Sequence, residues 1–308
     1  MANRIWVLGD AVVDLIPDGE QHYLKCAGGA PANVAVGIAR LGVPSAFIGK
    51  VGKDPLGEFM QQTLQNEKVN TDFMRLDPKQ RTSTVVVGLD NGERSFTFMV
   101  NPSADQFLTA DELPTFQANE WLHFCSIALI NDPSRTATFT AMRQIHQAGG
   151  KVSFDPNLRE SLWHSQAEMI EVVMQAVELA DVLKFSEEEL CLLLGYDNLD
   201  QAFKNICQRY PQKLIIVTLG KDGALYHLNG YSNIVKGKAL KPVDTTGAGD
   251  AFVSGLLSGL AQQENWQQPK ILEKIIRQAN ASGALACTAK GAMSALPNQQ
   301  QLAEFLAS

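Results

Sequence analysis

The chain has 308 residues, of which 45% are hydrophobic and 19% charged, and its formal net charge is −7. This composition is typical of a soluble globular protein with a substantial core, and it excludes a disordered or fibrous chain. The negative charge argues against nucleic acid or an anionic membrane as a partner, so any phosphorylated ligand needs a local site. The length suits one large α/β domain with a small appendage as well as two ordinary domains.

The N-terminal segment and the cysteines favour a cytoplasmic location. Asp10 and Asp14 interrupt the apolar stretch of MANRIWVLGDAVVDLIP, which predicts a first strand and not a signal peptide. The sequence has no uninterrupted run of about 18 apolar residues, so we expect no membrane span. Five cysteines lack metal-like spacing and are expected to be reduced thiols packed in the core: Cys26, Cys125, Cys191, Cys207 and Cys287.

Strand and helix signals alternate in the first third of the chain. A buried strand is expected over 5–8, and the glycine turn at 28–29 leads into a buried helix that closes at Gly42. SAFIGKVG is strand-like, and Asp54-Pro55 predicts the start of the next helix. These elements are the first repeats of a strand-then-helix rhythm.

That rhythm breaks between about 81 and 100. TSTVVVGLD and ERSFTFMV flank Asn91-Gly92, which is the strongest hairpin signal in the sequence. An antiparallel hairpin does not belong inside a parallel core. We therefore expect a discontinuous β lid, formed from about 12–27 and 81–102, that projects over a site.

From Trp121 onward the alternation resumes. The strand-like runs WLHFCSI, KVSFD, DVLKF and KLIIVTLG are separated by helical segments. Such spacing predicts βαβ units with right-handed crossovers, in which ligands lie at the carboxyl ends of the strands. Because no repeat or low-complexity linker is present, we expect residues 1–308 to form a single domain.

The stretch VDTTGAGDAF, residues 243–252, is the first candidate for chemistry. Its small residues let the backbone approach a ligand, and the first amides of the following helix lack internal partners, which makes an anion hole. The Lys-Ser/Thr of a Walker A loop is missing, so this is not a P-loop NTPase. Asp250 in the first turn either stabilises the helix start or takes part in the reaction.

The second candidate joins Asp10, Asp14 and Asn33 around the 28–29 turn. Carboxylate and carboxamide groups are suited to gripping the hydroxyls of a sugar. The alternative is that Asp10 and Asn33 only satisfy turn amides.

Three further segments carry two readings each. Arg159 in FDPNLR either holds an anion or is simply solvated. The acids 187–189 either hold a hydrated Mg²⁺ or stabilise a helix start. The turn 218–223 either borders a nucleotide or is an ordinary hairpin. The five histidines show no metal spacing and the chain has no Gly-x-Ser-x-Gly elbow, so neither suggests a role.

Together these strings, in this order, resemble the ribokinase-like carbohydrate kinases, also called the PfkB family. Two signatures carry the resemblance, GGAPANVAVGIARLG at 28–42 and DTTGAGDAF at 244–252, and it runs from about residue 4 to 297. It implies a three-layer α/β/α ribokinase-like fold with a mostly parallel central sheet and a small β-sheet lid. It also implies ATP-dependent phosphorylation of a sugar hydroxyl.

Within the family the sequence is most similar to bacterial fructokinases, through WVLGDAVVDL, RTSTVVV, GERSFTFMV and AKGAMSALP. This similarity implies the conversion of fructose and MgATP to fructose 6-phosphate and ADP. Aminoimidazole riboside kinase is the first alternative, followed by ribokinase and 2-keto-3-deoxygluconate kinase. A non-catalytic sugar sensor on the same fold is a further alternative, and it predicts loss of the base or of the anion-hole glycines. Relatives often pair through the lid, which implies a possible homodimer.

The resemblance also assigns residues. Asp250 matches the catalytic base and Gly247, Ala248 and Gly249 the anion hole. The implied sugar-binding residues are Asp14, Gly29, Asn33, Phe98, Arg159 and Asp250. The implied ATP-binding residues are Lys184, Ser186, Thr218, Leu219, Gly220, Lys221, Asp222 and Gly223.

Two cations are implied as well. Relatives hold a monovalent cation, generally K⁺, at positions that match Asp244, Thr246, Ala286, Ala289 and Gly291. Glu189 matches a residue that holds Mg²⁺ through water. Relatives often have Asn-x-x-Glu there, and this chain departs from that pattern with Ser186 in the first position.

Overall fold

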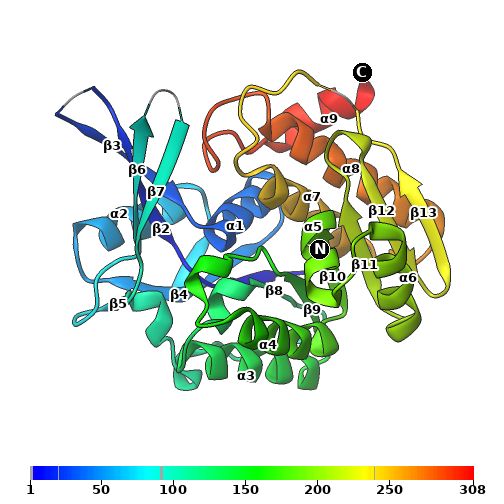
Figure 1. Ribbon diagram of the computed structural model, residues 1–308, viewed down its shortest axis with the longest axis horizontal. Helices are drawn as coiled ribbons and strands as arrows, with labels where there is room; N and C mark the ends of the chain where they lie inside the picture. The colour runs from blue at the N-terminus through cyan, green and yellow to red at the C-terminus, as the bar shows by residue number, and fades with distance from the viewer. Residues whose placement is uncertain (1–2, 20, 91–92, 239) are drawn as a thin grey trace.

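The computed structural model describes residues 3–19, 21–90, 93–238 and 240–308. Its centre is a large sheet (Figure 1) whose strands are β1 (Ile5–Leu8), β4 (Ser45–Gly52), β5 (Asn70–Asp77), β8 (Trp121–Cys125), β9 (Lys151–Asp155), β10 (Val182–Ser186), β11 (Leu214–Thr218), β12 (Ala224–Leu228) and β13 (Tyr231–Val235). Their spatial order is β13-β12-β11-β10-β9-β8-β1-β4-β5. In the described part of this sheet, the β11–β12 and β12–β13 pairs are antiparallel and the other pairs are parallel, so the predicted mostly parallel sheet is confirmed.

Helices cover both faces of this sheet. One layer contains α1 (Ala30–Arg40), α2 (Pro55–Asn66), α7 (Ala248–Gln262) and α8 (Pro269–Ala286), with α9 (Gln299–Ala307) packed on α8. The other contains α3 (Ser134–Gln147), α4 (Gln166–Leu179), α5 (Glu187–Leu194) and α6 (Leu199–Arg209). The predicted three-layer α/β/α architecture is therefore confirmed.

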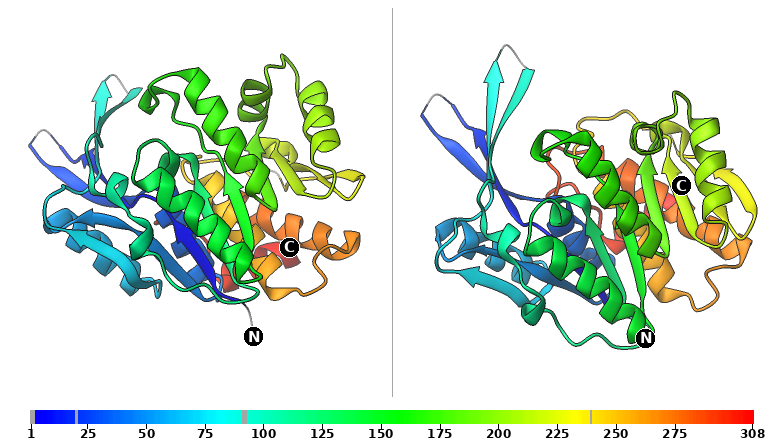
Figure 2. Two further views of the ribbon diagram at one scale, coloured as in Figure 1. Left: turned by 90° about the horizontal axis from the view of Figure 1, so that it is seen from below. Right: turned by 60° about the horizontal axis from the view of Figure 1, so that its bottom comes forward.

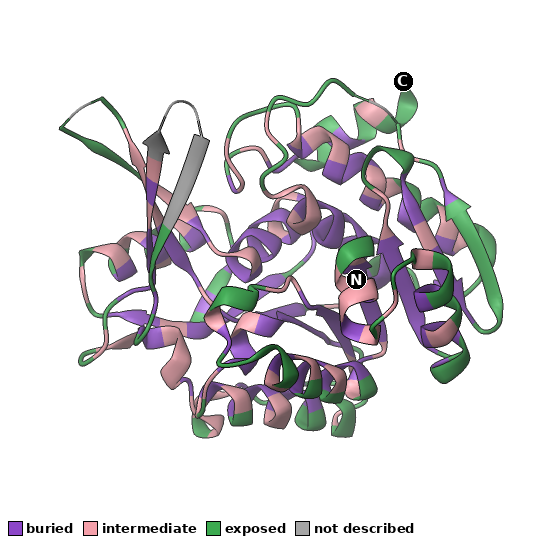
Figure 3. Ribbon diagram, viewed as in Figure 1, coloured by how far each residue is buried: buried purple, intermediate pink, exposed green. Residues whose placement is uncertain are grey.

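The central strands are buried on both sides because helices cover both faces. In β1, Ile5 and Val7 belong to one hydrophobic core while Trp6 and Leu8 belong to the other. Figure 3 shows the strands as buried elements between partly exposed helices. This explains why β1 appears in the sequence as a continuous apolar run without alternation.

A smaller sheet projects from this body, as Figure 2 shows. Its strands are β2 (Val12–Pro17), β3 (Tyr23–Gly28), β6 (Thr84–Asp90) and β7 (Glu93–Met99), in the order β3-β2-β6-β7. They lie in the two segments expected to form the lid, and β6 pairs antiparallel with β7. The expected turn at Asn91-Gly92 lies outside the described residues.

Local signals explain where the helices begin. Asp54 caps α2 by accepting hydrogen bonds from the Leu56 and Gly57 amides at 3.0 and 2.8 Å, and Pro55 follows at the first position. Helix α7 begins differently, at Gly247 with φ 78°, a left-handed conformation that glycine adopts without strain. Of the helices in the described ranges, none combines the length and apolar character that a membrane crossing needs.

Candidate active site

Two cavities meet where the carboxyl ends of the central strands face the start of α7. The lid cavity, of about 470 Å³, lies between the lid and the strand ends, and the helix cavity, of about 390 Å³, lies between the turn after β11 and helices α7 and α8. Gly249 lines both of them. A group transferred from one cavity to the other would therefore pass the first turn of α7.

All of the residues predicted to bind the sugar line the lid cavity. They come from the lid (Asp14, Phe98), from the start of α1 (Gly29, Asn33), from the loop after β9 (Arg159) and from α7 (Asp250). Segments separated by more than two hundred positions thus converge on one cavity. Its walls also include Gly247 and Thr246 from the DTTGAGDAF stretch.

Asp250 is held in place by the first turn of another helix. Asn33 Nδ2 donates a hydrogen bond of 2.8 Å to Asp250 Oδ2, which links α1 to α7. Burial raises the pKa of Asp250 to about 6, although the Asn33 hydrogen bond and the charges of Lys184 and Arg159 oppose the shift. Such a carboxyl is mostly ionised at neutral pH and still takes up a proton readily, as a general base must.

The start of α7 is open to an anion. In the described part of the chain no side chain caps this helix, so its first amides are available to a ligand. A Cβ added to Gly247 would lie 2.9 Å from Ala292, so only glycine fits against that neighbour. The sequence GAG thus provides the left-handed backbone conformation and the small side chains that this helix start requires.

A buried cation lies beside this helix start. Lys184 Nζ contacts both oxygens of Asp155, at 3.1 and 3.0 Å, and lies 3.6 Å from the position of a Cβ on Gly249. Burial alone would lower the pKa of Lys184, but the charges of Asp155 and Glu189 outweigh it and raise that pKa. Lys184 therefore remains charged next to the anion hole. It was predicted to bind ATP, and it lines the lid cavity.

Two further carboxyls face the lid cavity. Burial raises the pKa of Asp14 to about 6. Burial and the nearby charge of Asp105 raise the pKa of Asp10 to about 7, and its Oδ1 is buried with no hydrogen-bond partner among the described residues. Asn33 Oδ1 is also buried without a hydrogen-bond partner among the described residues. Unpaired polar atoms in a cavity wall favour a ligand that carries hydroxyl groups.

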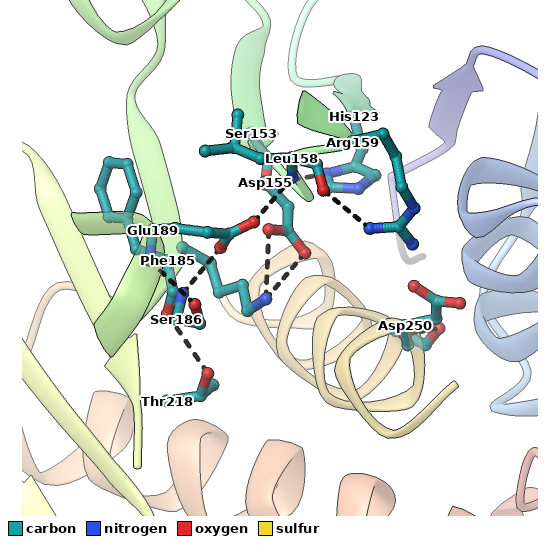
Figure 4. A network of polar contacts seen from close by, with 12 residues as sticks. His123, Ser153, Asp155, Leu158, Arg159, Phe185, Ser186, Glu189, Thr218 and Asp250 are labelled. Carbon is teal, nitrogen blue, oxygen red and sulfur yellow. Dashed lines mark hydrogen bonds and ion pairs between the residues drawn. The ribbon is translucent and has the colours of Figure 1, made fainter. Parts of the chain in front are cut away.

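Ser186 and Glu189 form a capping box at the start of α5. The Ser186 side chain accepts from the Glu189 amide at 3.1 Å, and Glu189 Oε2 accepts from the Ser186 amide at 2.8 Å. The other oxygen, Oε1, accepts from the Leu158 amide at 2.8 Å (Figure 4). This pair thus performs the structural role that the sequence left open, and any metal role remains a prediction.

The turn after β11 borders the helix cavity. Its lining includes Thr218, Gly220, Lys221 and Gly223, while Leu219 and Asp222 complete the same turn. Because β11 also pairs antiparallel with β12, the segment is a hairpin turn that lines a cavity, and its contact with a nucleotide remains a prediction. Ala248 and Gly249 form the end of the helix cavity that faces the lid cavity.

Three of the residues predicted to hold a monovalent cation are joined by hydrogen bonds. Asp244 Oδ1 accepts from the amide and the hydroxyl of Thr246, at 3.0 and 2.7 Å, and Oδ2 accepts from the Gly291 amide at 3.1 Å. Ala286 ends α8 in the core, and Ala289 follows in the next loop. The described residues contain no cluster of three or more His, Cys, Asp or Glu side chains that suits a metal ion.

Sequence reasoning did not assign several cavity residues. In the lid cavity these include Cys125, Asp155, Asn157, Leu162 and Ala292, whereas Asp10 was already a candidate together with Asp14 and Asn33. In the helix cavity they include Lys238, Leu240, Pro242, Asn280 and Cys287. Position at the end of a strand was a usable signal for Asp155, the last residue of β9, whereas the helix-cavity residues carry no local motif.

Comparison with known proteins agrees with this geometry. The pfkB family of carbohydrate kinases matches residues 2–299. The chain belongs to this family. The predicted enzyme class, an ATP-dependent carbohydrate kinase, is therefore confirmed.

The relatives include enzymes of two substrate classes. A fructokinase of Vibrio alginolyticus is 52% identical over 305 residues, with 99% of both chains covered. An aminoimidazole riboside kinase of Salmonella typhimurium is 43% identical over 307 residues, covering 99% of this chain and 96% of the relative. The chain is thus more similar to this fructokinase than to this aminoimidazole riboside kinase over nearly its full length.

Solved fructokinase structures match the chain along its whole length. The crystal structure of fructokinase from Vibrio cholerae O395 with fructose, ADP and calcium ion bound has a TM-score of 0.93 and 57% identity, with 99% of both chains covered. A double mutant of that enzyme, with fructose, ADP and potassium ion, has a TM-score of 0.93 and 56% identity, covering 99% of this chain and 98% of the other. Its relatives therefore include enzymes crystallised with a sugar and a nucleotide together.

Proposed function

We propose that this kinase transfers the γ-phosphoryl group of ATP to the primary hydroxyl of fructose, giving fructose 6-phosphate and ADP. The observation that carries the proposal is the position of Asp250, which lines the lid cavity one residue after Gly249, the shared wall of both cavities. A sugar hydroxyl in the lid cavity would meet the base and the anion hole together. The fructokinase relatives supply the identity of the sugar.

The chain's own residues divide the work of the reaction. Asp250 removes the proton of the attacking hydroxyl as its oxygen bonds to the γ-phosphorus and the bond to the leaving ADP oxygen breaks. The amides at the start of α7 receive the charge of the transferred group, and Lys184 neutralises part of it. Little covalent help is needed, because alignment and charge neutralisation supply most of the acceleration of phosphoryl transfer.

We propose that Mg²⁺ reaches the site as the ATP complex. Both oxygens of Glu189 accept backbone hydrogen bonds, and direct coordination would compete with that capping box. Mg²⁺ keeps several water molecules and is usually held by substrate phosphates with one or two carboxylates. Glu189 is therefore suited to hold a metal-bound water, and the ion supplies positive charge to the phosphates when it is bound.

We further propose that K⁺ binds beside the anion hole. The residue types suit this ion, because Asp244 and Thr246 bring a carboxylate and a hydroxyl to the loop that precedes α7, where the Gly291 amide donates to that carboxylate. A relative crystallised with potassium supports the choice of ion. The bound cation would steady the peptide dipoles of 244–249.

The lid face is suited to pairing with a second copy. Tyr23 and Leu24 on the edge strand β3 are each 56% exposed, and Met99 on the other edge strand β7 is 42% exposed. Exposed apolar side chains on an unpaired sheet edge favour association. We propose a homodimer through the lid.

The test of the sugar assignment is a coupled ADP-release assay with four acceptors: fructose, aminoimidazole riboside, ribose and 2-keto-3-deoxygluconate. Each acceptor is assayed with K⁺ and with choline in its place. The proposal requires fructose to give the highest kcat/KM. Turnover of another acceptor without turnover of fructose would refute it.

A further inference from the structure

The side chain of Arg40, at the end of α1, contacts both Glu67, which follows α2, and the loop between α8 and α9. On one side it forms a bidentate ion pair with Glu67, with Nε to Oε2 at 2.8 Å and Nη2 to Oε1 at 2.6 Å. On the other side its Nη1 donates to the carbonyls of Met293 and Leu296, at 3.0 and 2.8 Å. Both carbonyls belong to the loop 287–298, which connects α8 to α9.

The first part of this loop, residues 287–292, contacts the segment that precedes α7. The carbonyl of Cys287 accepts from the Asp244 amide at 3.3 Å, and the Gly291 amide donates to Asp244 Oδ2 at 3.1 Å. Ala292 packs against Gly247 so closely that a methyl group on that glycine would lie 2.9 Å away, and it also lines the lid cavity. The loop therefore touches the anion hole and the proposed cation site at once.

From these contacts we infer that Arg40 is a positioning residue for phosphoryl transfer, acting through the loop 287–298. Its guanidinium fixes the carbonyls of Met293 and Leu296. The same loop thereby holds Gly291 and Ala292 in contact with the residues that precede α7. Arg40 lines neither the lid cavity nor the helix cavity, so we expect it to act without contacting the sugar or the nucleotide.

The energetics of the pair explain why an arginine is needed. Both side chains are largely shielded, with exposed fractions of 21% for Arg40 and 28% for Glu67. The hydrogen bonds from Arg40 lower the pKa of Glu67, so the pair stays ionised at neutral pH. A planar fork satisfies the carboxylate and still donates to carbonyls on its other edge, which the single point charge of a lysine does not do.

The chain offers a matched control in Arg135. It donates to the carbonyls of Leu129 and Ile130 at 2.6 and 2.5 Å and pairs with Glu168 at 2.7 Å. The exposed fractions of this pair, 24% and 29%, are close to those of the Arg40 pair. Arg135 lies on α3, in the opposite helix layer from α7. Its replacement should cost similar stability without loosening the anion hole.

The test compares Arg40→Met, Arg40→Lys and Arg135→Met by calorimetric titration with ADP and by the K⁺ dependence of turnover. Loss of a residue that orients a metal ligand costs about 10–100-fold in metal affinity or activity, and we take the lower end of that range for a residue that orients the start of α7. We expect Arg40→Met to weaken ADP binding about tenfold and to raise the half-saturating K⁺ concentration by a similar factor, with Arg40→Lys intermediate. Arg135→Met should bind ADP within about twofold of the unaltered protein.

ADP binding and the K⁺ dependence of turnover distinguish a failure of the role inferred for Arg40 from a failure of the proposed cation site. The K⁺ measurement depends on the proposed cation site, whereas ADP binding does not depend on that site or on the sugar. The inference is overturned if Arg40→Met binds ADP as tightly as the unaltered protein and its urea midpoint falls as much as that of Arg135→Met. Arg40 would then only stabilise the fold. If Arg40→Met does not fold, Arg40→Lys decides by the same criterion.

Discussion

Replacement of Asp250 by Asn is the sharpest test of the base assignment. The change is isosteric, and an amide at 250 still accepts the hydrogen bond that Asn33 donates at 2.8 Å. The fold, the cavities and ADP binding should therefore persist. Only the proton acceptor is lost, and a positioned general base contributes about 10²–10⁴-fold to a rate. We expect kcat to fall by about that factor, with ADP affinity within about threefold of the unaltered enzyme.

The pH profile gives a second, independent measure. Because burial raises the pKa of Asp250 to about 6, roughly nine-tenths of the carboxyl is ionised at pH 7 and roughly one-tenth at pH 5. The base acts in its ionised form, so kcat/KM should fall about tenfold per pH unit below pH 6. Asp250→Asn should lose this acidic limb, since its residual activity needs no ionised group at 250.

The control is Asp14→Asn, because burial raises the pKa of Asp14 to a similar value and its side chain also lines the lid cavity. This variant should raise KM for fructose while keeping most of kcat. An Asp250→Asn enzyme that turned over at a near-normal rate, or that kept a limb near pH 6 which disappeared only in Asp14→Asn, would refute the reasoning.

Three further predictions concern stability and assembly. Gly247→Ala places a side chain at a left-handed φ of 78° and against Ala292, so it should cost about 1–2 kcal/mol and lower kcat, as thermal unfolding and the ADP-release assay will test. The pKa of Asp14 is raised from 3.8 to about 6, so its buried charge destabilises the fold above pH 6 by about 3 kcal/mol. Asp14→Asn should therefore raise the urea midpoint at pH 8 and not at pH 4, and equal gains at both pH values would contradict this. Leu24→Glu should halve the mass seen in sedimentation if the lid forms the dimer; an unchanged dimer would place the interface elsewhere.

The alternation of strands and helices was predictable because its signals are local. Continuous apolar runs, glycine turns and the Asp54-Pro55 start each lie within a few residues, and the structure places elements there. Strand β5 escaped prediction because NTDFMRLD has no clear period. It is an edge strand whose pairing within the described residues is with β4, through a register shift. Helix α6 was also missed, although its buried residues at 202, 203, 206 and 207 follow a helical period.

The site was predictable where a residue type follows a strand or opens a helix, and not where packing alone brings it in. Asn280 and Cys287 reach the helix cavity because α8 packs on α7, and no pattern near them in the sequence announces a ligand. The S-x-x-E of 186–189 illustrates the opposite difficulty. One short string suits both a capping box and a metal site, and only the structure shows that the capping box is formed.

The residues that fix the position of α7 lie two and three turns after its first residue. A Cβ on Gly255 would lie 3.0 Å from Ala279, and one on Gly259 would lie 2.7 Å from Ile275, so both glycines let α7 pack closely on α8. On another face, Ser254 Oγ donates to the Val34 carbonyl of α1 at 3.2 Å. Helix α7 is thus fixed to α1, which carries Asn33 toward the sugar side, and to α8, which forms the wall of the helix cavity. The apolar run GLLSGLA after the DTTGAGDAF signature therefore fixes the position of α7, and with it Asp250 and Gly249, because a packed core tolerates little displacement.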